Sequence, residues 1–460
     1  MDVLRDPALS PDTWAPFYSE VSQPPPSPLQ GPVTTTATPQ VVNEIQTAHN
    51  EFRRFIAFKL RDVCNTAGIQ QMATPLKPGQ LKPDNSLLPY GAREVARFLA
   101  HLGASLQQKL VISTLSFPAL STGFPLLANN KYTDPILLQQ HFAEMSPALR
   151  QVGLDDRLVA PFAAISHSFF TKNSDRVVEI ARRGIHDADR PAAWSLLLGV
   201  QTTTQNKPAR KSSTGGSRKK PPSQVINPAT DTLTFIDILV LSDIAETASD
   251  EHHFIFQAAL TRLLPQFINT PISLPRDAYL YERIAVRDTD GTMIPASGIL
   301  PFRGLSLYLA PFLFLYDEED ALIHARACYT KYFYRLHTLD GLAPLVGLAE
   351  LLVAEACPDI ITRFKTLQAV DPDAGLLSIL VPWLMSGFAG YLMPREYFQL
   401  WDRILGYDCL ELLSVFAAAL IIFKARTTIH LTDGKDVQYY MHDLSGTLVV
   451  PLLQMALFDV

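Results

Sequence analysis

The feature that most constrains the fold is the C-terminal half of the chain. From about Phe235 to Val460, apolar segments with three- and four-residue spacing follow one another with short connections. Such spacing predicts amphipathic helices, and apolar arcs as wide as these predict helices that pack on several sides. Apolar residues make up 47% of the 460 residues and charged residues only 18%, which suits large buried cores. Residues 279–286, rich in aromatic and β-branched side chains, are the best candidate for a short strand. We therefore expect an all-α domain.

One part of this half, residues 374–393, carries no charge and is long enough to span a bilayer. It contains Pro382 together with glycines and serines, and Arg395 and Glu396 follow closely. Helix breakers in mid-span need neighbouring helices to satisfy the freed backbone groups. We therefore favour a buried core helix over a transmembrane span.

The N-terminal part has a different composition. Residues 1–40 are rich in proline and threonine and are expected to be a disordered tail, since they cannot bury enough apolar surface to offset chain entropy. Residues 41–177 form a predicted helical N-terminal region, in which a helix ends at Thr66-Ala67-Gly68 and others cover about 92–110, 131–151 and 155–170.

Net charge and cysteine content narrow the class of protein. The formal net charge of −6 gives no electrostatic footprint for nucleic acid. The four cysteines form no C-x-x-C pair, which fits a reducing compartment rather than a disulfide framework or a thiolate metal site. The first residues lack the basic and apolar regions of a signal peptide.

The first informative motif is RGIHDADRPAAWSLLLG, which begins at Arg183. In it Arg190 and Trp194 are four residues apart, so they share one helix face. An arginine there can form a bidentate bond with a carboxylate while the indole anchors the helix in the core.

Two further motifs follow it along the chain. The sequence VLSDIAET contains Asp243, Glu246 and Thr247, and the sequence ILPFRGLS contains Arg303 and Gly304. All three motifs resemble signatures of the TBC-domain family: the opening Gly-Ile…Arg…Trp motif, the I-x-x-D-V-x-R-T helix and the Y-x-Q-G-M segment. In the family, the second signature contains the arginine finger and the third contains the glutamine finger.

The resemblance continues downstream in the same order. Trp383 and Phe388 match the family's W-x4-F step, and Trp401 and Asp402 match its L-W-D signature. The resemblance covers about residues 178–428, and the order and spacing of the motifs together make it specific. It implies a TBC domain over residues 178–460, with a disordered basic insert at about 203–228. A nuclear-import patch or attraction to an anionic membrane surface are alternatives for that insert.

The resemblance also implies a function and a departure from it. TBC domains accelerate GTP hydrolysis by Rab GTPases, so a Rab partner is expected, whereas GTP and magnesium would belong to that partner and not to this chain. Glu246 stands at the arginine-finger position and Arg303 at the glutamine-finger position. Because a carboxylate is repelled by a phosphate, Glu246 is not expected to be catalytic.

Three interpretations of Arg303 remain open. It could act as a displaced arginine finger while the Rab's own glutamine orients the water. It could be a solvated or ion-paired loop residue, or it could bind a switch region of the GTPase without chemistry. Arg190 and Asp243, on helices that are adjacent in the family, are expected to pair with each other.

We assign no catalytic or metal-binding role to two other clusters of charged residues and histidines. Glu251-His252-His253 has no metal-binding spacing, so no metal site is predicted. The acidic run at residues 317–320 is most simply the N-terminal end of a helix, where acids complement the helix dipole.

The sequence therefore predicts a Rab GTPase regulator of the TBC family. We expect it to be an atypical or non-catalytic one, in the cytoplasm, at work in vesicle trafficking control, with peripheral attachment to endomembranes left open. The alternative is an interaction scaffold that uses the TBC fold without binding a GTPase.

Overall fold

The computed structural model describes residues 39–69, 75–77, 79–110, 130–152, 174–200, 233–274 and 295–458. Across these ranges the regular structure is helical, without a strand. The helices are α1 (Pro39–Thr66), α2 (Ala92–Leu110), α3 (Pro135–His141), α5 (Ser174–Arg183), α6 (Arg190–Leu197), α7 (Phe235–Thr247), α8 (Gln257–Asn269), α10 (Glu318–Cys328), α11 (Tyr334–His337), α12 (Leu339–Ala356), α13 (Pro358–Val370), α14 (Leu377–Met385), α15 (Pro394–Tyr407), α16 (Leu412–Thr428), α17 (Gly434–His442) and α18 (Val449–Phe458). This confirms the predicted all-α class.

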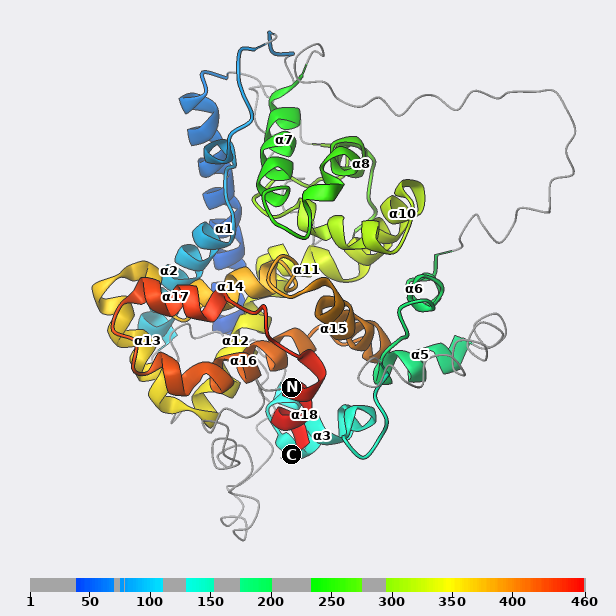
Figure 1. The fold of residues 1–460 in the computed structure, drawn as a ribbon. Helices are drawn as coiled ribbons and strands as arrows, with labels where there is room; N and C mark the ends of the chain where they lie inside the picture. Colours follow the sequence, from blue (N-terminus) through cyan, green and yellow to red (C-terminus); the bar gives the residue numbers. More distant parts are fainter. Residues whose placement is uncertain are drawn as a thin grey trace, which may run out of the picture.

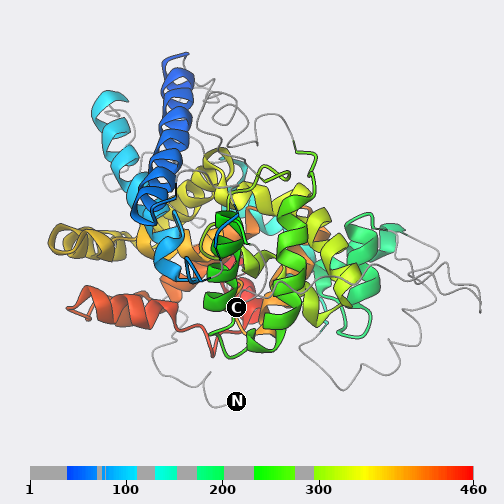
Figure 2. The ribbon, with the colours of Figure 1, turned by 90° about the horizontal axis from the view of Figure 1, so that it is seen from above.

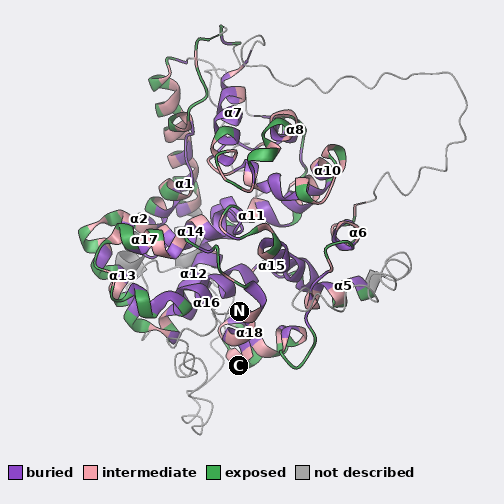
Figure 3. Cartoon of the chain, in the orientation of Figure 1, coloured by how far each residue is buried: buried purple, intermediate pink, exposed green. Residues whose placement is uncertain are grey.

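The core lies where the most apolar helices cross. In α12, α14 and α16 most residues are buried, because each helix is apolar around most of its circumference and packs on several neighbours (Figure 3). α12 packs against both α14 and α16, and α15 packs against α5 and α18. α7, α8 and α10 form a separate group of helices above them (Figure 1).

The uncharged segment at residues 374–393 is a buried element, as predicted. Its helical part is α14, where Trp383 is completely buried, and Pro382 lies inside the helix. Across the part of the chain that is described, none of the helices combines the length and apolarity that a membrane crossing requires.

The N-terminal helices pack directly on the C-terminal ones. α2 spans the predicted residues 92–110 and lies against α14, while α1 contacts α2 and α12. Figure 2 shows α1 and α2 projecting together on one side of the molecule. α1 ends at Thr66, as the Thr-Ala-Gly sequence predicted, and Gly68 has a φ of +67°.

One helix prediction was wrong. Residues 131–151 do not form a continuous helix but break into a 3-10 turn, α3 and a second 3-10 turn at Ala143–Met145. Ser146 precedes a proline and is extended, with ψ at 137°, because the proline ring disfavours helical backbone at the preceding residue. The predicted tail, the helix at 155–170, the strand at 279–286 and the basic insert lie outside the described residues.

At the start of α10 the acidic run behaves as predicted. The Asp317 side chain is the N-cap and accepts a hydrogen bond from the Asp320 N–H, and three acids occupy the first turn. They complement the positive end of the helix dipole.

Candidate functional site

The second and third sequence motifs meet through one buried carboxylate. Asp243, on α7, accepts hydrogen bonds from the backbone N–H groups of Gly304 and Ser306, each at 2.6 Å. The Thr247 and Ser306 hydroxyls lie 2.6 Å apart and add a third tie. Gly304 has a φ of +98°, a conformation that L-residues rarely adopt. α7 therefore fixes the 302–306 loop through backbone groups as well as side chains.

Burial and hydrogen bonding act on Asp243 in opposite directions. Burial raises its pKa to about 6, although the Ser306 hydroxyl and the two N–H groups favour the charged form. The carboxylate is therefore retained at a desolvation cost, and its contribution is to satisfy two N–H groups of the loop.

We predict that Asp243→Ala lowers the free energy of unfolding by about 2 kcal/mol, because two N–H groups, at Gly304 and Ser306, lose their acceptor. Urea denaturation followed by circular dichroism measures the change. Asp359→Ala, an exposed aspartate on α13, is the matched control, and we expect it to stay within about 0.5 kcal/mol of wild type. Equal midpoints for the two variants would contradict the anchoring role.

Glu246 and Arg303, which the resemblance aligns with the two fingers, form an ion pair with each other. The Arg303 Nε donates to Glu246 Oε2 at 3.1 Å, and each side chain is about a third exposed, at 34% and 36%. The Arg303 guanidinium also donates to the backbone carbonyl of Asn85 at 3.0 Å, and its backbone N–H to that of Tyr90 at 2.9 Å. Burial raises the pKa of Glu246, while Arg303 opposes that shift. Of the three interpretations of Arg303, this geometry is that of an ion-paired loop residue.

A cavity of about 410 Å³ opens beside this ion pair. Its walls come from the end of α7, the 302–306 loop, the turn after α14 and the first turn of α2. The lining residues are Ala92, Arg93, Glu246, Thr247, Asp250, Phe302, Arg303, Gly304, Leu307, Pro382, Met385, Ser386, Ala389, Gly390 and Tyr391. The N-terminal region thus contributes to the same cavity as the finger positions.

The turn after α14 is held by the W-x4-F step. The rings of Trp383 and Phe388 stack with their centroids 5.7 Å apart, and Phe388 adopts a φ of +66° although it is not glycine. Trp401, from the L-W-D signature, donates its indole N–H to the Gly387 carbonyl at 2.9 Å. These aromatic residues form the base of the turn that lines the cavity.

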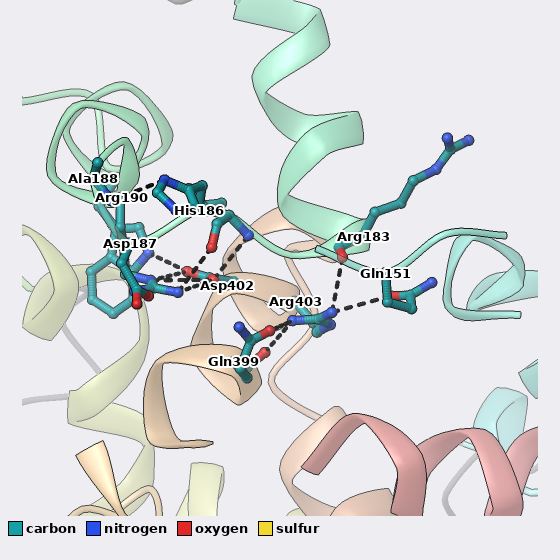
Figure 4. A network of polar contacts seen from close by, with 11 residues as sticks. Gln151, Arg183, His186, Asp187, Ala188, Arg190, Gln399, Asp402 and Arg403 are labelled. Atoms are coloured by element: carbon teal, nitrogen blue, oxygen red, sulfur yellow. Dashed lines mark hydrogen bonds and ion pairs between the residues drawn. The ribbon is translucent and has the colours of Figure 1, made fainter. Parts of the chain in front are cut away.

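The expected Arg190–Asp243 pair does not form, and that prediction was wrong. Arg190 instead binds Asp402 of α15, with Nε 3.1 Å from Oδ1 and a terminal nitrogen 3.1 Å from Oδ2 (Figure 4). α6 packs on α5 and α15, which brings Arg190 to Asp402, whereas Asp243 is satisfied by the 302–306 loop.

Asp402 joins the opening motif to the L-W-D signature. Besides Arg190, it accepts the Trp194 indole N–H at 2.7 Å and the Ile185 backbone N–H at 3.1 Å. The Arg190 guanidinium in turn donates to the Ile185 carbonyl at 2.9 Å. Asp402, Arg190 and Trp194 are all buried, so this network is structural and lies in the core.

The neighbouring Arg403 is a buried cation that sequence analysis missed. It donates to Gln399, to the Gln151 side chain at 3.1 Å and to the Arg183 carbonyl at 2.9 Å (Figure 4). Burial lowers its pKa to about 10. A side chain on Gly184, whose φ is +99°, would collide with this guanidinium at 2.8 Å. Sequence gives no clear signal for it, because Arg403 follows Asp402 in an amphipathic helix and its partners lie far away along the chain.

The Glu251-His252-His253 sequence lies in a turn, and two of its residues contact the Asp250 carboxylate. His253 Nδ1 lies 2.8 Å from Asp250 Oδ1, and the His252 N–H also bonds this carboxylate. In the described ranges no three His, Cys, Asp or Glu side chains are grouped to hold a metal ion.

Comparison with known proteins gives one informative match. The chain is 28% identical over 345 residues to TBC1 domain family member 19 from Homo sapiens, an alignment that covers 70% of this chain and 62% of that protein. The chain thus spans less than two thirds of the relative's length. No family model matches the sequence, and no solved structure matches it. The Pro-Phe-x-Gly segment, the glutamate aligned with the arginine finger and the LWDRILGY sequence also resemble this family member.

Proposed function

Because this chain is related to the TBC-domain family, we propose that it regulates a Rab GTPase by binding it without supplying either finger. The Rab is bound on the face formed by the end of α7 and the 302–306 loop. The chain recognises the GTP-loaded state, and GTP and magnesium remain ligands of the Rab. Its place of action is the cytoplasmic face of endomembranes, in the control of vesicle traffic.

The framework that would present the two fingers supports the binding part of the proposal. Asp243 and Thr247 tie α7 to the 302–306 loop, and Gly304 provides the required backbone conformation. These are motif positions of the family. The cavity beside them offers a concave surface on the same face.

The Glu246–Arg303 ion pair is the observation that carries the non-catalytic part. An arginine finger in trans is worth about 10³- to 10⁵-fold in hydrolysis rate, through positive charge placed at the transferring phosphoryl group. Here a carboxylate occupies that position and pairs with the guanidinium of Arg303. At 4 Å from a phosphate oxygen, such a carboxylate would be repelled by about 4 kcal/mol at an effective dielectric constant near 20.

Two measurements on the purified chain test the proposal. A pull-down across a panel of Rabs loaded with GTP or GDP is expected to give GTP-selective binding of at least one Rab. Single-turnover hydrolysis by that Rab is expected to remain within about tenfold of its intrinsic rate, far below the effect of a finger.

Arg303→Ala separates the remaining possibilities, and Arg262→Ala, in a partly exposed ion pair with Glu318, is the control. We expect neither variant to change hydrolysis. Acceleration by several orders of magnitude that disappears only in Arg303→Ala would instead establish a displaced arginine finger. Failure to bind any Rab in either nucleotide state would leave the scaffold alternative.

A further inference from the structure

We infer that Arg93, at the start of α2, contacts an anionic group of the bound GTPase across the cavity beside Glu246 and Arg303. This rests on the proposed function. The contact assigns a role to the N-terminal region, which lies outside the TBC resemblance. The anion is a nucleotide phosphate or a carboxylate of the GTPase, and both offer oxygens to a guanidinium.

The position of Arg93 is the first support. Arg93 and Arg303 are the two cations that line this cavity. Arg303 is already engaged by Glu246 and by the Asn85 carbonyl. The Arg93 side chain is 64% exposed, so it is accessible to a partner.

The charge balance around Arg93 is the second support. Arg93 and Arg97, one helical turn apart, share the single carboxylate of Asp373. The hydrogen bonds of Arg97 to Asp373, at 2.6 and 2.5 Å, would remain if Arg93 left. If Arg93 moves away, Asp373 therefore still has Arg97 as its partner. The two arginines together carry one positive charge more than Asp373 neutralises.

The acids on the same side are held by other groups. Glu246 faces Arg303, and Asp250 accepts from the His252 N–H and lies against His253. Glu94 accepts the Gly91 N–H at 2.9 Å and so caps its own helix. Among the cavity cations, Arg93 is therefore the one that can turn to an incoming anion at the least cost.

The N-terminal segment is fixed firmly enough to place Arg93. Tyr90 stacks on Phe302 with ring centroids 5.5 Å apart, and its carbonyl accepts the Arg303 N–H. Gly91 lies so close to Arg303 that an added Cβ would meet the Arg303 Cβ at 2.8 Å. The first turn of α2 is thus joined to the 302–306 loop.

Arg97 provides a matched control. It shares Asp373 and is similarly exposed, at 54%, but it does not line the cavity beside Glu246 and Arg303. It lines a neighbouring cavity of about 340 Å³, which Arg93 also lines. Arg93→Ala and Arg97→Ala each remove one guanidinium from the same partly exposed carboxylate, that of Asp373, so their effects on melting temperature should be alike.

The experiment is a titration of the full chain and its variants against the Rab that wild type binds, at two salt concentrations. Arg93→Ala is expected to weaken binding about tenfold and to reduce its salt dependence, whereas Arg97→Ala, which leaves Arg93 as the arginine on Asp373, is expected to weaken binding by a smaller factor. Arg93→Lys should recover part of the loss. A fold-loss larger for the GTP-loaded than for the GDP-loaded Rab identifies the γ-phosphate as the anion, and an equal fold-loss in both nucleotide states identifies a carboxylate or a phosphate that GDP also carries.

Equal effects of the two alanine variants, or none, would overturn the role of Arg93 while leaving the proposed function intact. If wild type binds no Rab, the proposed function fails first and this inference fails with it.

Discussion

Asp402→Ala is expected to destabilise the protein by about 3–5 kcal/mol, the cost of breaking a buried ion pair from one side. The carboxylate is completely buried and holds three donors, Arg190, Trp194 and the Ile185 N–H. Without it a buried guanidinium and an indole N–H lose their shared acceptor. Chemical denaturation of the purified variant measures the loss, and poor soluble yield is expected.

Two further variants make this prediction specific. Glu318→Ala removes an exposed partner of Arg262 and should cost at most about 1 kcal/mol. The double variant Arg190→Met with Asp402→Leu removes both buried charges, so it should be less destabilised than Asp402→Ala alone. If the free energy of unfolding of Asp402→Ala stays within about 1 kcal/mol of wild type, the ion pair with Arg190 does not stabilise the fold as predicted.

The sequence motifs identified the residues of this buried network, but they did not identify which of those residues contact one another. The four-residue step from Arg190 to Trp194 correctly predicted one helix face, because helical spacing is a local property. Their shared partner is on α15, more than two hundred positions away, and local spacing carries no information about that distance. Both Asp243 and Asp402 are buried carboxylates within motifs, so sequence alone could not decide between them.

There is a second reason why the contacts of the candidate site could not be predicted from the sequence. The ties that hold the 302–306 loop are largely backbone groups: the N–H groups of Gly304 and Ser306, and the carbonyls of Asn85 and Tyr90. Any residue other than proline supplies an N–H, so these contacts leave no compositional signal. Gly304 is the exception, since its positive φ favours glycine.

The helices themselves were easier to predict from the sequence. The bounds of α2 and the capping of α10 by Asp317 follow from apolar periodicity and from capping chemistry, which act within a few residues. The Glu246–Arg303 pair could not be found in this way. Its two residues were singled out separately as finger replacements, and only the packing of α7 against the loop brings them together.

The double variant Glu246→Arg with Arg303→Gln is expected to convert the chain into a GTPase activator. On the proposed function, it places the family's arginine on α7 and the family's glutamine on the 302–306 loop, and Asp243 and Thr247 still tie the helix to the loop. We expect single-turnover hydrolysis by the bound Rab to rise by about 10³-fold, the lower end of what an arginine finger supplies. The double substitution replaces both members of the ion pair, so neither the Glu246 carboxylate nor the Arg303 guanidinium is left without its partner.

The single variants should fall far short of this. Glu246→Arg alone brings two guanidinium groups together, and Arg303→Gln alone leaves a carboxylate facing the phosphate, repelled by about 4 kcal/mol at 4 Å. Arg262→Gln with Glu318→Arg changes the same residue types at an ion pair that does not line the cavity, and it should not accelerate hydrolysis.

Binding decides what a negative result means. If the double variant retains GTP-selective binding but accelerates nothing, the 302–306 loop does not face the nucleotide. In that case the Glu246–Arg303 pair is only a structural contact. If the double variant is active, the framework is competent and the pair at its centre is what keeps the wild-type chain silent. The two finger positions then act as one unit, because each charge is neutralised by the other within a single ion pair at 3.1 Å.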